Sequence, residues 1–120
     1  MIVIDTSVWI DHFRREHTQI VMLLISGDLH HHPLVTAELA MGNLHNWRRT
    51  VTLLGQLPQA LYVSQAEMLD FVEDAGLAGS GIGMVDAHLL ASTRAVGGRL
   101  WTQDRRLFEQ ADRLGVAYRI

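Results

Sequence analysis

The chain has 120 residues, 48% of them apolar and 19% charged, with a formal net charge of −3. This composition fits one globular domain over residues 1–120, and it argues against disorder and against a basic protein that coats nucleic acid. The absence of cysteine excludes disulfides and thiolate metal sites and favours a cytoplasmic setting. No apolar run approaches the ~18 residues needed to cross a bilayer, so no membrane segment is expected.

Apolar runs and turn residues predict strands that alternate with helices. In the first half of the chain we expect a strand over 1–5, helices over 7–15 and 18–26, a strand over 29–32, and helices over 35–41 and 46–54. In the second half we expect a strand over 60–63, helices over 64–75 and 84–96, a strand over 99–102, a helix over 105–114 and a strand over 116–120. This alternation predicts an α/β domain with a central, mostly parallel sheet.

Several local signals refine these elements. Thr6 or Ser7 can cap the first helix, and Ser64 followed by Glu67 forms a capping box for the helix over 64–75. The apolar stripe of that helix is expected at Ala66, Leu69 and Val72, with its acids facing solvent. The helix over 18–26 is apolar on nearly all sides, which suggests burial in a subunit interface as well as in the core.

Four acidic residues are expected at one edge of the sheet. Asp5 ends the first strand, and Asp104 follows the strand that ends at Thr102, while Glu38 and Asp86 are each placed in the first turn of a helix. In open α/β sheets ligands bind at the carboxyl ends of the strands, so the four carboxylates should converge there. Unpaired carboxylates repel one another, and oxygen ligands favour Mg²⁺ or Mn²⁺ as the ion that would hold them together.

Each acid also has a purely structural interpretation. Asp104 could cap the following helix, and Asp86 could complement a helix dipole. Asp5 is harder to explain in this way, because a carboxylate directly after four buried apolar residues is poorly solvated. The neighbouring hydroxyls of Ser7 and Thr102 could hydrogen-bond a carboxylate or a phosphate, although helix capping is the favoured role for Ser7.

Four short motifs carry these acids. They are Asp5-Thr6-Ser7 after an apolar strand, Thr36-Ala37-Glu38-Leu39, Ile82-Gly83-Met84-Val85-Asp86-Ala87 and Trp101-Thr102-Gln103-Asp104. Their order and spacing resemble the four acidic motifs of PIN domains over essentially the whole chain. The short length is most similar to that of VapC-type toxins from prokaryotic type II toxin–antitoxin systems.

This resemblance implies a three-layer α/β/α fold and a metal-dependent endoribonuclease that hydrolyses RNA phosphodiester bonds. It implies that Asp5, Asp86 and Asp104 are the main ligands of Mg²⁺ or Mn²⁺, and that Glu38 completes the site and orients or deprotonates the attacking water. It further implies a homodimer and a cognate antitoxin protein whose segment blocks the acidic site, with an arginine as one way to do so.

Three other patterns in the sequence carry residues that could bind a metal or RNA. The run His30-His31-His32 invites a zinc interpretation, but neighbouring side chains of a strand point to opposite faces, so a structural role is favoured. The loop Gly79-Ser80-Gly81-Ile82-Gly83 matches no phosphate-binding motif and is expected to be a flexible connection. The arginines in Arg14-Arg15 and Trp47-Arg48-Arg49 could contact RNA, face a partner or be solvated.

Two other functions compete with a nuclease for this pattern of acids. A phosphoacceptor receiver domain needs a lysine late in the chain, and this chain has no lysine. The alternative that the sequence leaves open is a PIN-like module that binds RNA or protein without cleaving it.

Overall fold

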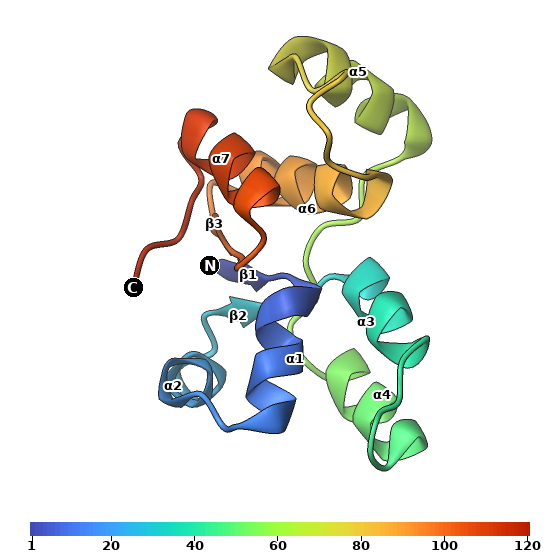
Figure 1. Ribbon diagram of the computed structural model, residues 1–120, viewed down its shortest axis with the longest axis vertical. Helices are drawn as coiled ribbons and strands as arrows, with labels where there is room; N and C mark the ends of the chain where they lie inside the picture. Colours follow the sequence, from blue (N-terminus) through green and yellow to red (C-terminus); the bar gives the residue numbers. More distant parts are fainter.

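A computed structural model describes residues 1–120. Its centre is a three-stranded parallel sheet with the strand order β2-β1-β3 (Figure 1). The strands are β1 (Ile2–Ile4), β2 (Leu29–His30) and β3 (Arg99–Trp101). The central strand β1 is buried along its whole length, as expected of a parallel strand that is covered on both faces.

The structure has seven helices. They are α1 (Thr6–Arg14), α2 (Thr18–Ser26), α3 (Pro33–Ala40), α4 (Trp47–Gly55), α5 (Gln65–Ala75), α6 (Met84–Ala95) and α7 (Arg105–Arg113). Figure 1 shows α1 and α2 on one side of the sheet and α6 and α7 on the other, with the α3–α4 pair and α5 extending away from the sheet. The predicted three-layer α/β/α fold is confirmed.

Side chains cap several helix starts. The capping box of α5 is present as predicted, with Glu67 N–H donating to Ser64 Oγ over 3.1 Å and Ser64 N–H donating to Glu67 Oε1 over 3.2 Å. The cap of α1 differs from the prediction, because Asp5 occupies that position and accepts from Val8 N–H, so neither Thr6 nor Ser7 is the cap.

Two predicted strands are absent. Residues 60–63 and 116–120 form no strand, and each neighbourhood contributes only an isolated bridge, His31–Gln59 and Leu100–Ala117. The predicted strand over 29–32 likewise ends at His30. His31 still exchanges backbone hydrogen bonds with its neighbours Pro58 and Ala60, at 2.8 and 2.9 Å. The apolar runs at 60–63 and 116–120 thus lie beside the sheet, but each neighbourhood pairs with the chain at an edge of the sheet over too few residues to form a strand.

The core is one cluster of 25 buried apolar residues. On α5 the predicted inward stripe is wrong for Ala66 and Leu69, which are exposed, while Val72 packs against the core as predicted. The buried residues of this helix are Met68 and Ala75. On α2, Met22 and Ile25 are 57% and 82% exposed, and the subunit interface proposed for this helix stays a prediction. No helix of the structure is long and apolar enough to span a bilayer.

Candidate functional site

Asp5 is the most buried of the four predicted acids. Its side chain is 4% exposed, and its backbone N–H donates to Trp101 C=O over 3.0 Å, which continues the pairing of β1 with β3. Asp5 and Thr102 thus follow the paired residues Ile4 and Trp101 side by side. Thr102 Oγ1 donates to Asp5 Oδ2 over 2.5 Å.

Ser7 supports the other oxygen of the same carboxylate. Its hydroxyl donates to Asp5 Oδ1 over 2.5 Å and accepts from Gln103 N–H over 3.1 Å. Its role is therefore to tie Asp5 to the loop after β3, and the capping role that the sequence favoured for Ser7 is wrong. Burial raises the pKa of Asp5, and the hydrogen bonds from Ser7, Thr102 and the Val8 backbone oppose that rise.

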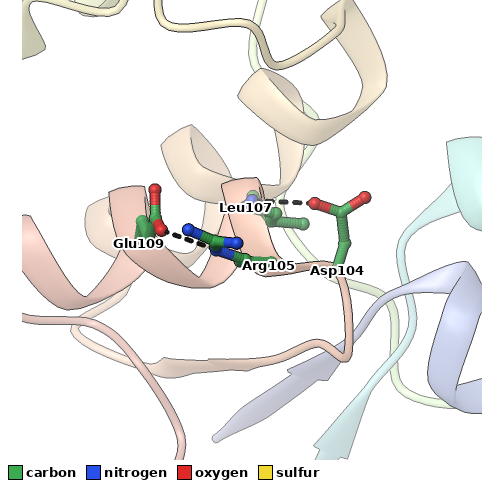
Figure 2. A network of polar contacts seen from close by, with 4 residues as sticks. All are labelled: Asp104, Arg105, Leu107 and Glu109. Atoms are coloured by element: carbon green, nitrogen blue, oxygen red, sulfur yellow. Dashed lines mark hydrogen bonds and ion pairs between the residues drawn. The ribbon is translucent and has the colours of Figure 1, made fainter.

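Asp104 begins α7 at the end of the same loop. Its Oδ1 accepts from Leu107 N–H over 3.0 Å (Figure 2). Its own backbone N–H donates to Thr102 Oγ1 over 2.9 Å. The structural interpretation of Asp104 as a helix cap is thus correct, but it engages only one carboxylate oxygen in the structure. Thr102 links both acids, since it contacts Asp5 through its hydroxyl hydrogen and Asp104 through its oxygen.

Asp86 lies in the first turn of α6, as predicted. Its pKa is raised to about 6, first by burial and then by the negative charges of Asp5, Asp104 and Glu38. All three other predicted acids therefore act on this one carboxyl group.

Glu38 enters the site from α3, but in the second turn of that helix and not in the first turn that the sequence suggested. Its Oε1 accepts from Thr6 Oγ1 over 2.6 Å. This contact joins α1 to α3, and no sequence pattern had singled out Thr6 as a partner of Glu38.

The four acids share one electrostatic neighbourhood without neutralising cations. The two ion pairs of the structure, Arg105–Glu109 and Arg119–Asp112, involve none of them. The acids do not form a complete metal-binding site in this structure, because no group of three or more histidine, aspartate or glutamate side chains is arranged to hold a metal ion. The chemistry of the donors nevertheless fits a hard divalent cation, since Asp86 lies within the electrostatic influence of the three other carboxylates and none of the four forms an ion pair.

A groove of about 630 Å³ adjoins Glu38 between α1, α3 and α4. Apolar side chains of Ile10, Phe13 and Leu53 line it together with the cations of Arg14 and Arg49. The groove thus combines apolar and positively charged surface next to one of the four acids.

The histidine run is structural. His31 and His32 are fully buried, and burial lowers the pKa of each to about 4, which leaves both neutral at pH 7. His32 Nδ1 accepts from Leu34 N–H at the start of α3, and His31 Nε2 lies 2.5 Å from Thr36 Oγ1. His31 and His32 therefore anchor α3, the helix that carries Glu38.

Comparisons with known proteins agree with the fold. The chain is 44% identical to "Ribonuclease VapC32" of Mycobacterium tuberculosis over 118 residues, which cover 98% of this chain and 95% of the relative. The fold is similar to a solved structure of VapBC-1 from nontypeable Haemophilus influenzae, with a TM-score of 0.69, 18% identity and coverage of 99% and 97%. It is also similar to FitAcB from Neisseria gonorrhoeae, with a TM-score of 0.61, 19% identity and coverage of 98% and 95%.

The family model described as "PIN domain" matches residues 2–114, a span that contains all four acids and the sheet that carries them. The chain belongs to the PIN-domain family.

Proposed function

We propose that this protein is a metal-dependent endoribonuclease and the toxin of a toxin–antitoxin pair. The observation that carries the proposal is the set of four carboxylates without cationic partners at the carboxyl edge of a parallel sheet. The close similarity to a protein named a ribonuclease supports the choice of RNA as substrate. Because that substrate is cellular RNA, we expect the protein to act in the cytoplasm.

The residues proposed to hold Mg²⁺ or Mn²⁺ are Asp5, Asp86 and Asp104, with Glu38 completing the site. When bound, such a cation supplies Lewis acidity that activates water and offsets negative charge on the phosphoryl oxygens. Burial and the negative charges of the three other acids raise the pKa of Asp86, and both are energetic reasons why these residues favour a cation.

The chain's own residues have separate tasks in this proposal. Ser7 and Thr102 fix both oxygens of Asp5, so that this carboxylate keeps one orientation while it is poorly solvated. Glu38 is exposed and held by a single hydroxyl, which suits a group that orients or deprotonates the attacking water.

The antitoxin is proposed to lie in the groove beside Glu38. The structures similar to this chain include VapBC-1 and a FitAB complex bound to DNA, which support a partner of this kind. Apolar side chains of such a segment could pack on Phe13 and Leu53, and an arginine at its end could reach Glu38 and close the acidic site.

The experiment that tests the function uses purified protein and total cellular RNA with Mn²⁺, with Mn²⁺ plus excess chelator, and with the Asp5→Asn variant. Discrete cleavage is expected only for the wild type with free Mn²⁺, and the ends of the fragments identify the target RNA. RNA that is bound but uncut by the wild type would instead support the non-cleaving PIN-like module.

A further inference from the structure

The glycine loop before α6 has a close contact that its sequence did not suggest. Gly81 adopts a φ of +88°, and a Cβ placed on it would lie 3.2 Å from Arg106 Nη1 and 3.5 Å from Arg106 Cδ. Glycine therefore meets two needs at this position, since it allows the left-handed backbone and lets the arginine side chain lie directly against the loop. The contact links the start of α7 to the segment that leads to Asp86.

Arg106 is a cation without a partner at the edge of the acidic site. It forms no ion pair, no side-chain hydrogen bond and no contact with an aromatic ring, and its side chain is exposed. Together with Asp104, Arg105 and Glu109 it lines a pocket of about 530 Å³ to which no apolar residue contributes. The cation thus shares a pocket with a proposed metal ligand without neutralising it.

Arg105, the preceding residue, provides the contrast. Its Nε donates to Glu109 Oε1 over 3.2 Å, and Figure 2 shows this side chain extending along α7 away from the Asp104 carboxylate. One arginine of the pair is therefore engaged within its own helix, and the other is free.

We propose that Arg106, laid over Gly81, binds a backbone phosphate of the RNA next to the phosphate that is cleaved. This inference rests on the proposed ribonuclease function and extends it to the placement of the substrate. Carboxylates repel the phosphates of a nucleic-acid strand wherever no metal ion offsets their charge. The phosphates next to the one that is cleaved therefore need positively charged side chains of the protein. The planar guanidinium can donate two parallel hydrogen bonds to a phosphate. The contact of the Arg106 side chain with the loop limits its motion before RNA binds, so less side-chain entropy is lost on binding.

The test measures RNA binding in an Asp5→Asn background, which removes cleavage. A labelled single-stranded RNA of mixed sequence is titrated with protein in the presence of Mn²⁺ at several salt concentrations. The proteins are the Asp5→Asn background and the same background with Arg106→Gln, Arg106→Lys or Arg105→Gln in addition. Arg105→Gln is the matched control, since it removes the same charge from the adjacent position of the same helix.

Arg106→Gln is expected to raise the dissociation constant about tenfold and to reduce the salt dependence by about 0.7 in log–log slope, the value for one lost phosphate contact on a single strand. Arg106→Lys should recover part of the affinity, and Arg105→Gln should stay within about twofold of the background. Equal losses for both glutamine variants, or no loss for either, would overturn the inference and leave the ribonuclease function standing. Failure of every protein to bind RNA would also overturn the inference, whereas the ribonuclease function is decided by the cleavage experiment on the wild type.

Discussion

The protein carries two groups of four acids, and they differ in almost every physical respect. At the sheet edge, Asp5 is buried, and burial together with the neighbouring negative charges raises the pKa of Asp86 to about 6. On the outer face of α5 the acids are solvent-exposed, and the hydroxyl and backbone of Ser64 lower the pKa of Glu67. The acids of that face are Glu67, Asp70, Glu73 and Asp74.

The comparison shows that a count of carboxylates does not define a site. Four acids on one exposed helix face are each hydrated and weakly coupled. Four acids drawn from separate elements to one sheet edge repel one another through a partly buried space, and they gain most from a bound cation. Substitutions in the two groups should therefore have different consequences for cleavage, metal binding and stability.

The largest difference is expected in catalysis. Asp5→Asn should reduce RNA cleavage by about 10³-fold, equivalent to about 4 kcal/mol in the activation barrier, because it removes a proposed metal ligand. Asp70→Asn on α5 makes the same chemical change on an exposed surface and should leave the rate within about twofold. The measurement is the cleavage rate of the mapped RNA target at saturating Mn²⁺. Comparable losses for the two variants would contradict the distinction between the groups.

Metal binding should appear in stability as well as in activity. Mn²⁺ at 100 times its dissociation constant should raise the free energy of unfolding by about 2.7 kcal/mol. Asp86→Asn should remove most of this gain and Asp70→Asn none of it, as measured by denaturant unfolding at each metal concentration. An undiminished Mn²⁺ response in Asp86→Asn would exclude this carboxylate from the metal site.

The hydroxyl network should have a smaller effect than the acids it supports. Thr102→Val keeps the shape of the side chain but removes the donor to Asp5 Oδ2 and the acceptor for Asp104 N–H. We expect the affinity for Mn²⁺ to fall about 10- to 100-fold, and Thr102→Ser to restore most of it. Isothermal titration calorimetry provides the measurement. If both variants bind Mn²⁺ as tightly as the wild type does, Thr102 has no positioning role.

Much of the fold could be predicted because its signals are local. The capping box at Ser64 and Glu67 and the left-handed glycine at Gly27 mark helix ends within a few residues. The apolar runs after Gln59 and Gly115 carry the same local signal as true strands. Whether they pair is decided by the length of the neighbouring edge strand, which lies far away in the sequence.

The site was predictable to the extent that topology determines it. Asp5 and Asp104 follow adjacent parallel strands, so their shared edge could be inferred from the pattern alone. The hydrogen bonds from Ser7 to Asp5 and from Thr6 to Glu38 could not be inferred from the sequence, because each depends on a side-chain rotamer or on how two helices pack. The same holds for the contact of Arg106 with Gly81.

The pH dependence of stability should distinguish the two groups by sign. In the metal-free protein the pKa of Asp86 is about 6 in the folded state against 3.8 for the free residue, so the protonated carboxyl is the form that folding favours. The contribution of the protonated Asp86 carboxyl to the free energy of unfolding is fully present below pH 3.8 and is lost as the pH rises through 6. Asp86→Asn should therefore be more stable than the wild type by about 1 kcal/mol at pH 7.5, after allowance for solvent screening, and equal to it near pH 3.5. Thermal unfolding in chelator across this range provides the test, and a wild type that gains stability over Asp86→Asn as the pH rises would reverse the assignment.

The smallest effect is expected on α5, with the opposite sign. The folded-state pKa of Glu67 lies below 4.5, so its ionised form supports folding above that pH, and the support is lost as the pH falls through the lowered value. Glu67→Gln keeps an acceptor for Ser64 N–H but loses the charge near the start of the helix. Its melting temperature should fall slightly below that of the wild type at pH 7.5 and meet it at acid pH, with an unchanged response to Mn²⁺. One acid would then destabilise the metal-free fold at neutral pH while the other stabilises it, and only the first would respond to a cation. Asp86→Asn and Glu67→Gln should therefore shift the melting temperature at pH 7.5 in opposite directions. A shift in the same direction would show that burial and mutual repulsion do not distinguish the acids of the sheet edge from those of α5.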